Sequence, residues 1–443
     1  MELTPAALQH FLKQTAGTHR YWIALSGGID SSVLLHLLSQ CSSEMAASSL
    51  RAVHIDHQLQ PESSGWGVMC RDMASSLGVE YHEIKVEAHA SKGESPEAAA
   101  RNARYATLES LIEPGDLLLT AHHQEDQAET LMLQLMRGAG PKGLASMPTT
   151  TPFGRGELFR PLLEFSRAEL EAYAAKHQLS WIDDPSNGDT GFDRNYLRHE
   201  IMPLLQRRWP AVARTVSRSA SNCAEASDLL DQLAELDLQG VQRRDTLLVS
   251  ELNRLSDSRQ RNLIRFWVAS HHLPLPDSRR LDAIMQQLLP AKEDAMPLVK
   301  WRGAEVRRYQ GRLYLMQPLA EAPDRALSLV WHQESVIELP QSLGTLQIQK
   351  VTGEGVAVAH LERCELSVSF RRGGEYCKIS GHAHHRKLKQ LLQELGVPPW
   401  QRGRIPLIYL DNELAAIGDR WICEPFQAQV GESGGKIVWN SPF

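Results

Sequence analysis

YWIALSGGIDSS, at residues 21–32, is an apolar run that passes directly into a glycine turn and a serine-rich helix start. The run predicts a buried strand, and Val33, Leu34 and Leu37 recur after the turn at helical spacing. Such a turn aims several backbone N–H groups at one point, and the helix N-terminus adds partial positive charge. No lysine follows the glycines, so the turn is not a Walker loop. We interpret it as a phosphate-binding turn, with a plain tight connection as the alternative; its members are Ser26, Gly27, Gly28, Ile29, Asp30 and Ser31.

Alternation of strands and helices continues after this turn. Apolar segments near 51–56, 81–86 and 116–120 predict strands, and a Pro96 helix start and the stretch 124–136 predict helices. This order indicates an α/β fold with a doubly wound parallel sheet, in which ligands bind beyond the carboxyl ends of the strands. Several polar side chains fall at those ends: Ser26, His54, Asp56, His122 and His123.

The stretch TAHHQEDQAET, at residues 120–130, holds the second group of reactive side chains. Two histidines lead into a helix that places Asp126 and Glu129 on one face. Carboxylates near a triphosphate can hold Mg²⁺, bind an ammonium group or accept its proton, and His122 can donate to a phosphate or a carbonyl. Acidic residues in a first helical turn also complement the helix dipole, which is the simpler alternative.

Arginines form the third group. Arg101 and Arg104 lie on one predicted helix, and Arg194 and Arg198 are four residues apart on another. Guanidinium groups clamp phosphates and carboxylates, although such residues also serve solubility. The chain has a net charge of −6, yet 194–218 holds six arginines and one carboxylate, and 371–404 holds eight lysines or arginines and two glutamates. These stretches predict contacts with a phosphate-rich ligand, with solvated helix faces as the alternative.

Length and composition limit the class of protein. A chain of 443 residues predicts two or three domains. It has no apolar run near the ~20 residues that span a bilayer, and no secretion signal at its start. The six cysteines are scattered without a C-x-x-C pair, which argues against a zinc ribbon, an iron–sulfur cluster or a disulfide framework. We expect a cytoplasmic protein that does not enter membranes.

Three domains are predicted. Residues 1–215 form the α/β domain, 216–335 a mainly helical middle domain, and 336–443 a small α+β domain. Leu229, Leu233 and Leu236 indicate a small helical bundle in the middle domain, with strand-like alternation returning near Ala304. Trp400 is expected in the core, with base stacking as the alternative, and the His-rich stretch 381–385 is expected to be a solvated loop near phosphates, with metal binding as the alternative.

The Ser26–Ser31 turn resembles the signature of the N-type ATP pyrophosphatases, also called the PP-loop superfamily. Its combination with further stretches resembles one branch, the tRNA(Ile)-lysidine synthetases. These stretches are ARNARY at 100–105, HHQEDQAET at 122–130, RG at 137–138, DPSN at 184–187 with Arg198, FRRGGE at 370–375, and 387–407. The turn alone marks only the superfamily, whereas the combination is specific. The likeness covers about 20–200 and 365–425 well, and Glu125 stands where the family pattern has Asp.

The resemblance implies an ATP- and Mg²⁺-dependent ligase that attaches free lysine to C2 of the wobble cytidine of tRNA(Ile) with anticodon CAU, through an adenylated cytidine. Codon reading and aminoacylation would change from methionine to isoleucine. The turn would hold phosphates, and Asp30 or Asp126 would meet Mg²⁺. Asp126 or Glu129 would bind the lysine ammonium and take its proton. The residues that would stabilise phosphate charge or position the RNA are His122, Arg101, Arg104, Arg194 and Arg198. The middle and C-terminal domains would contact the tRNA, and the sequence leaves a monomer and a homodimer open.

Three other functions share parts of these signals. A tRNA thiolase of the same superfamily needs catalytic cysteines or C-x-x-C pairs, which the chain lacks. An amidotransferase-linked synthetase needs a Cys–His glutaminase arrangement, which the sequence does not indicate. A tRNA-binding protein with an inactive ATPase fold is the alternative from another class, and the presence of Asp30, Asp126 and Glu129 argues against it.

Overall fold

The computed structural model describes residues 2–8, 20–41, 49–56, 63–86, 96–184, 188–292, 295–332, 336–379 and 384–441. The chain forms two compact units, Met1–Gln232 and Leu233–Phe443. This division falls inside one long helix, and the three-domain boundaries at 215 and 335 stay predictions. No helix in the described part of the chain is both long and apolar enough to cross a membrane.

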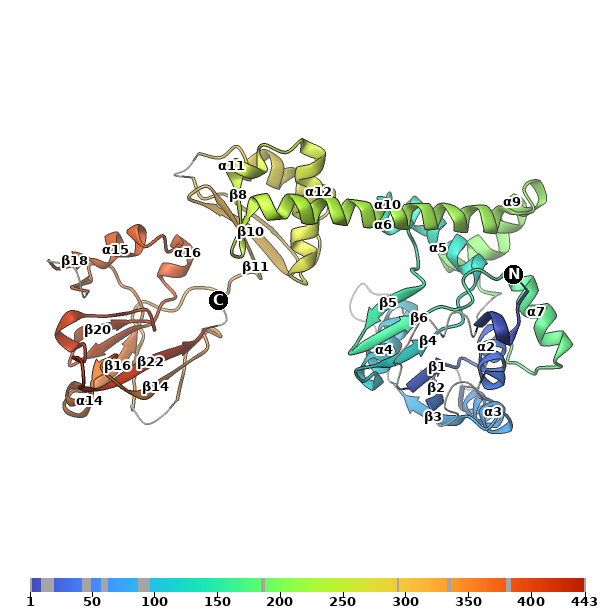
Figure 1. The fold of residues 1–443 in the computed structure, drawn as a ribbon, viewed down its shortest axis with the longest axis horizontal. Helices are drawn as coiled ribbons and strands as arrows, with labels where there is room; N and C mark the ends of the chain where they lie inside the picture. The colour runs from blue at the N-terminus through green and yellow to red at the C-terminus, as the bar shows by residue number, and fades with distance from the viewer. Residues whose placement is uncertain are drawn as a thin grey trace. The chain divides into compact units, whose positions relative to one another are not determined.

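A six-stranded sheet in the order β3-β2-β1-β4-β6-β5 forms the centre of the first unit (Figure 1). Its strands are β1 (Arg20–Ala24), β2 (Leu50–Asp56), β3 (Glu80–Lys85), β4 (Asp116–Leu119), β5 (Thr150–Phe153) and β6 (Gly156–Phe159). Ile23 of β1 pairs in parallel with Ala52 on one side and Leu119 on the other, so the parallel sheet is confirmed. β5 is an antiparallel edge strand that forms a hairpin with β6, and the apolar pattern of the sequence does not predict it.

Alternate side chains of the strands enter two different cores, because successive residues point to opposite faces. Ile23 and Leu119 pack in one core with residues of α2, α3 and α7, whereas Trp22 and Leu118 pack in the other with Leu108 of α4. The sheet is therefore covered on both faces, as the doubly wound prediction requires. The helices are α2 (Ile29–Gln40), α3 (Ser63–Ser76), α4 (Pro96–Leu111), α5 (Gln124–Met136), α6 (Pro141–Leu144) and α7 (Arg167–Lys176).

The segment after the sheet is helical and leads out of the first unit. It consists of α8 (Asp193–Tyr196), a π-helical turn (Leu197–Ile201), α9 (Met202–Arg208) and α10 (Val212–Val241). Ala128 of α5 packs with Met202 and Ala213, which fixes this segment against the helix that carries the predicted carboxylates.

The bundle predicted from the leucines of 229–238 is wrong, because these residues lie on the single continuous helix α10. Leu229 is 59% exposed and Leu236 is 65% exposed. The side of the helix that meets the second unit's core is instead Ala234, Leu238 and Val241, which follow the helical period. Leu229, Leu233 and Leu236 also have helical spacing, but they lie on a different face of the helix from Ala234, Leu238 and Val241.

The second unit begins with a five-stranded antiparallel sheet in the order β7-β8-β11-β10-β9 (Figure 1). Its strands are β7 (Gln242–Arg243), β8 (Thr246–Leu248), β9 (Leu298–Trp301), β10 (Ala304–Tyr309) and β11 (Arg312–Met316). Its helices are α11 (Val249–Leu252), α12 (Asp257–Ser270), α13 (Ser278–Ala283) and a π-helical turn (Ile284–Leu288). The β7–β8 hairpin lies in a stretch expected to be helical. Its turn uses Arg244 at a φ of 53°, so the usual glycine or asparagine signal is missing.

The C-terminal part of the second unit is α+β, as predicted. One sheet has the order β12-β16-β19-β20-β21, another β13-β14-β22-β15, and β17 pairs with β18. The strands are β12 (Ser328–Val330), β13 (Ile337–Glu338), β14 (Thr345–Thr352), β15 (Val356–Ala357), β16 (Leu366–Ser369), β17 (Tyr376–Cys377), β18 (Arg386–Lys387), β19 (Leu407–Leu410), β20 (Glu413–Ile417), β21 (Trp421–Ile422) and β22 (Ser433–Asn440). The helices are α14 (Val358–Arg363), α15 (Leu388–Glu394), α16 (Pro399–Arg402) and a 3₁₀ turn (Glu424–Phe426). Trp400 is buried, which confirms the expected core position.

Candidate active site

The glycine turn joins β1 to α2, as the sequence predicts. Gly28 is the N-cap of α2 and no side chain caps it, so the first N–H groups of the helix are open to an anion. Gly27 has a φ of +85°, and a Cβ there would lie 2.5 Å from Ile182 Cδ1. Any other residue at this position would therefore have a strained backbone, and the Ile182 side chain would have to move. The Ser31 hydroxyl donates to the Gly28 carbonyl at 2.9 Å and lies 3.1 Å from the Ser26 hydroxyl, which fixes the turn.

A cavity of about 320 Å³ opens beside the turn, at the carboxyl ends of β1, β2 and β4. Six of the residues predicted for the site line it: Ser26, Asp30, Ser31, Arg104, His122 and Asp126. The cavity has apolar as well as polar walls, because four further residues line it: His54, Trp66, Tyr105 and Asp184. This is the position at which a doubly wound sheet binds its ligands.

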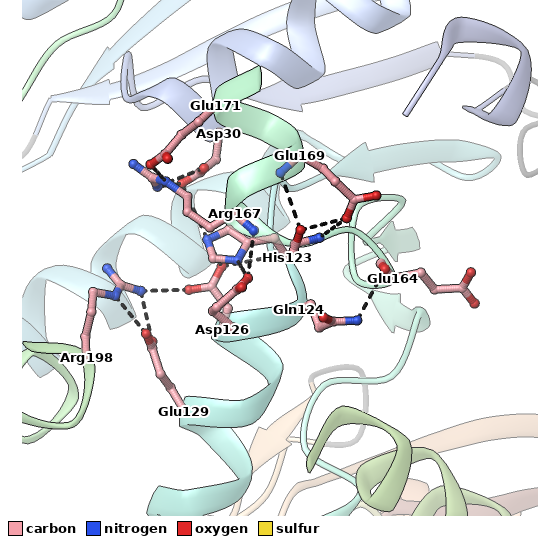
Figure 2. Close-up of polar contacts among 12 residues, drawn as sticks. Asp30, His123, Gln124, Asp126, Glu129, Glu164, Arg167, Glu169, Glu171 and Arg198 are labelled. Carbon is pink, nitrogen blue, oxygen red and sulfur yellow. Dashed lines mark hydrogen bonds and ion pairs between the residues drawn. The ribbon is translucent and has the colours of Figure 1, made fainter. Parts of the chain in front are cut away.

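His123 lies between the two aspartates predicted to meet a metal ion (Figure 2). Its Nε2 is 3.8 Å from Asp30 Oδ2 and 3.3 Å from Asp126 Oδ2, and its Nδ1 is 3.0 Å from Glu125 Oε2. Burial disfavours the charged imidazole, but these three carboxylates outweigh it and raise the pKa of His123. His123 is also the N-cap of α5, where its backbone N–H donates to Asp126 Oδ2 at 3.1 Å. The His123 side chain therefore lies within 4 Å of both Asp30 and Asp126.

Glu129 and Asp126 bind the two arginines that follow the sheet. Arg194 Nε donates to Glu129 Oε2 at 2.8 Å, and Arg198 Nε donates to Glu129 Oε1 at 2.7 Å. Both arginines also reach Asp126 Oδ1, at 3.2 and 3.0 Å. Burial opposes the charged form of Asp126, but His123, Arg194, His122 and Arg198 lower its pKa to about 2. In this structure the predicted phosphate-binding arginines are therefore paired with carboxylates, and Glu129 is only 1% exposed.

Arg167 is a member of the site that the sequence reading missed (Figure 2). Its guanidinium donates to both oxygens of Asp30, at 2.9 and 2.8 Å, and to Glu171 at 3.0 Å. Its backbone N–H donates to Glu125 Oε2 at 2.8 Å. Even so, burial raises the pKa of Asp30 above its ordinary value, against the opposing charges of His123 and Arg167. The stretch from Ser166 to Glu169 has the pattern of a capping box, which signals a helix start but not the partner of Arg167.

His122, Arg101 and Arg104 complete the predicted set. Burial lowers the pKa of His122 to about 3, so its imidazole is neutral near pH 7, and its Nδ1 lies 2.9 Å from the Thr120 hydroxyl. The guanidinium carbons of Arg101 and Arg104 lie 5.1 and 5.4 Å from the centre of the Tyr105 ring. Arg104 lines the cavity, whereas Arg101 is exposed.

Two predicted stretches fall partly outside the described residues. Asp184 lines the cavity, but Pro185, Ser186 and Asn187 are not described. Of the His-rich stretch, 384 and 385 are described and 381–383 are not. Within the described ranges no group of three or more His, Cys, Asp or Glu residues could hold a metal ion.

Family models match three parts of the chain. Residues 2–205 match a PP-loop domain, 247–314 the TilS substrate binding domain, and 366–439 the TilS substrate C-terminal domain. The chain is 43% identical over 439 residues to a tRNA(Ile)-lysidine synthase of Coxiella burnetii, covering 99% of this chain and 97% of that protein. It is 41% identical over 418 residues to the one from Methylococcus capsulatus, covering 93% and 94%. It is 42% identical over 434 residues to the one from Alkalilimnicola ehrlichii, covering 97% and 96%.

Proposed function

The chain belongs to the tRNA(Ile)-lysidine synthase family, and we propose that it attaches free lysine to C2 of the wobble cytidine of tRNA(Ile) with anticodon CAU. It is an ATP-dependent ligase that modifies a tRNA. The observation that carries the proposal is the cavity at the strand ends, where an open phosphate-binding turn faces Asp30, His122 and Asp126. Neither a thiolase nor an inactive tRNA-binding protein is favoured.

The reaction proceeds in two displacements. Cytidine O2 attacks the α-phosphorus of ATP, and the bond to the β-phosphate oxygen breaks to release pyrophosphate. The ε-amine of lysine then attacks C2, the C2–O bond breaks to release AMP, and the amine loses protons. The first step needs stabilisation of phosphate charge, for which the open N–H groups at the start of α2 are suited. The second needs a free amine, although the ordinary pKa of a lysine amine is about 10.4.

The residues at the cavity fit a magnesium ion. Asp30 and Asp126 both line the cavity beside the turn, and both lie within 4 Å of the same His123 nitrogen. Mg²⁺ is usually held by one or two carboxylates together with phosphate oxygens and water, so two aspartates suffice. When bound, the ion would neutralise charge on the phosphates. We therefore propose Asp30 and Asp126 as its protein ligands.

The arginines and Glu129 have separate roles in this proposal. Both oxygens of Glu129 accept hydrogen bonds from Arg194 and Arg198. Glu129 therefore positions the two arginines at the edge of the site. Asp126 is bound by the same two arginines, but it lines the cavity and Glu129 does not, so Asp126 is the better candidate to contact the lysine ammonium. Arg194 and Arg198, with Arg101 and Arg104, would act on phosphate charge or on the RNA backbone.

Incubation with ATP, Mg²⁺, radiolabelled lysine and a tRNA(Ile) transcript with anticodon CAU tests the proposal. Label is expected in the RNA, and it should vanish when the wobble cytidine is replaced or when Asp30→Ala is used. Cleavage of ATP to AMP without label in the RNA would contradict the proposed nucleophile or acceptor. The cytoplasmic location and the choice between a monomer and a homodimer stay predictions.

A further inference from the structure

The two displacements proposed above leave one polar group of the strand-end cavity without a role, His54 at the carboxyl end of β2. It lines the cavity, although the residue is only 5% exposed. We propose that His54 Nε2 accepts a hydrogen bond from the exocyclic amine of the adenine base, and that it thereby selects ATP among the purine nucleotides. The inference names a specificity-determining residue for the proposed function and rests on that function.

One ring nitrogen of His54 is held by the backbone of the neighbouring strand end. Nδ1 lies 2.9 Å from the Leu25 carbonyl, which can only accept, so Nδ1 carries the hydrogen and donates it. The Cys70 thiol lies 3.6 Å from the same nitrogen, and burial raises its pKa to about 12, so it offers no negative charge to an imidazolium. The carbonyl contact therefore fixes both the tautomer and the orientation of the ring.

The other ring nitrogen is open to the cavity. Among the residues that the structure describes, Nε2 has no hydrogen-bond partner, since both contacts of the ring involve Nδ1. Nε2 is also not one of the fully buried polar atoms that lack a partner, so part of its surface is accessible. Because the residue lines the cavity, that surface faces it. With the hydrogen on Nδ1, the neutral ring presents a bare acceptor at Nε2.

The walls beside His54 suit a flat aromatic base. Leu108 is 2% exposed and gives the cavity aliphatic surface, while Trp66 and Tyr105 add aromatic rings. A purine has apolar faces and a polar edge, so its site needs apolar walls and a few well-placed polar partners. A single neutral acceptor suits an uncharged amine. The lysine ammonium carries a full positive charge and pairs better with a carboxylate such as Asp126.

Adenine differs from the other common purines at its exocyclic group. Its N6 amine donates hydrogens, whereas guanine has an oxygen at the same position, which accepts. An oxygen facing His54 Nε2 would place two acceptors against each other and leave both unpaired, which costs more than a missing contact. The carbonyl bound to His54 belongs to Leu25, directly before Ser26, and both residues line the same cavity. A nucleotide with its phosphates at the turn can therefore bring its base to His54.

The test uses the full chain and purine riboside 5′-triphosphate, an ATP analogue that lacks only the exocyclic amine. Lysine incorporation into the tRNA(Ile) transcript is measured with either nucleotide at about pH 8, where an imidazole is ordinarily neutral. His54→Asn is the main variant, because an asparagine amide can still donate to the Leu25 carbonyl but has no atom at the Nε2 position. His54→Gln is the second variant, because the longer amide can reach that position.

The control is His177→Asn, since His177 is exposed at the end of α7 and does not line the cavity. The unaltered protein is expected to use ATP with a kcat/KM about tenfold above that of the analogue, the contribution of one hydrogen bond. His54→Asn should reduce this ratio to less than about twofold, and His54→Gln should restore part of it. Melting temperatures confirm folding. Equal use of both nucleotides by the unaltered protein, or an unchanged ratio in His54→Asn, would overturn the inference.

Cytosine is the other base of the proposed reaction that has an exocyclic amine. A transcript with 2-pyrimidinone, which lacks this amine, at the wobble position is compared with the cytidine transcript in the same variants. If His54→Asn changes selection at the wobble position and not the nucleotide ratio, the assignment to adenine is wrong. Failure of the proposed function has a different readout, because the unaltered protein would then place no lysine in the RNA with either nucleotide.

Discussion

At the strand ends of the first unit, Arg167, Arg194 and Arg198 all donate to carboxylates. The second unit has a cavity lined by four arginines, here called the arginine cavity: Arg325, Arg371, Arg372 and Arg404. Two of them, Arg372 and Arg404, donate to backbone carbonyls. In the first region these three arginines have counter-charges, so the groups hold one another in place before a substrate binds. In the second region backbone carbonyls, not carboxylates, fix Arg372 and Arg404. The first arrangement suits chemistry on a small reacting centre, and the second suits binding of a polyanion.

Substitutions in the two regions should therefore have different effects on activity. Removal of one charge from the strand-end network leaves its partners unpaired and should lower the rate of the reaction. Removal of the charge of Arg325 or Arg372 breaks no ion pair of the described residues and should lower RNA affinity alone. The following variants test this difference.

Asp126→Asn should have the largest effect. Asparagine can still accept the His123 backbone N–H at the start of α5, but it removes the negative charge that faces His123, Arg194 and Arg198. We expect a fall in the rate of lysine incorporation at saturating substrates of about 10²–10³-fold. Single-turnover assays with radiolabelled lysine measure it. Asp72→Asn, an exposed aspartate on α3, is the control, and an equally active Asp126→Asn enzyme would refute a chemical role for this carboxylate.

Glu129→Gln should have the next largest effect, on stability as well as rate. It removes a charge with 2% side-chain exposure and leaves Arg194 and Arg198, which are 25% and 33% exposed, with only one of the two carboxylates that they share. We expect about a hundredfold loss of rate and a melting temperature of the first unit lower by roughly 5–10 °C. Thermal unfolding followed by circular dichroism measures the shift.

The matched control is Arg155→Gln, which breaks the exposed pair between Arg155 and Glu113 in the same unit. An exposed pair contributes little, so its melting temperature should change by less than about 2 °C. Equal shifts in the two variants would show that the Glu129 network has no special structural role.

The double variant Arg325→Gln/Arg372→Gln should have a smaller effect of a different kind. Neighbouring charges are not fully additive, so we expect the KM for RNA to rise about 30-fold. The rate at saturating RNA should stay within about twofold of the unaltered enzyme, because neither side chain lines the strand-end cavity. Steady-state assays over a range of RNA concentrations separate the two parameters. A fall in the saturating rate without a change in KM would contradict the separation of roles.

Local sequence patterns predicted the parts of the site that are contiguous in the chain. The turn at Ser26–Ser31 and the helix Gln124–Met136 could be found because glycines, a strand and helical spacing lie next to one another. The same patterns could not predict that Arg167 pairs with Asp30, 137 residues away, since an arginine in a first helical turn has no distinctive partner signal. Nor could they show that Arg194 and Arg198 meet carboxylates of α5 in this structure. That contact depends on how the helices after the sheet pack on α5.

Glu125→Asp should have the smallest effect, and it tests the position at which the resemblance implies an aspartate. Glu125 Oε2 accepts from His123 Nδ1, within the same helix start, and from the backbone N–H of Arg167, on α7. Aspartate keeps the charge but is one methylene shorter, so it should keep the contact with His123 and lose the one with Arg167. Loss of one hydrogen bond of about 1 kcal/mol should lower kcat/KM three- to fivefold.

The control for Glu125→Asp is Glu164→Asp, because Gln124 contacts only the backbone carbonyl of Glu164 and the Glu164 carboxylate is exposed (Figure 2). If both variants keep full activity, the length of Glu125 is not used to hold α7. If Glu125→Asp alone is slower, the extra methylene of glutamate spans the gap to Arg167, whose guanidinium in turn holds Asp30. Glutamate at position 125 would then be part of the structural support that positions Asp30 beside the phosphate-binding turn.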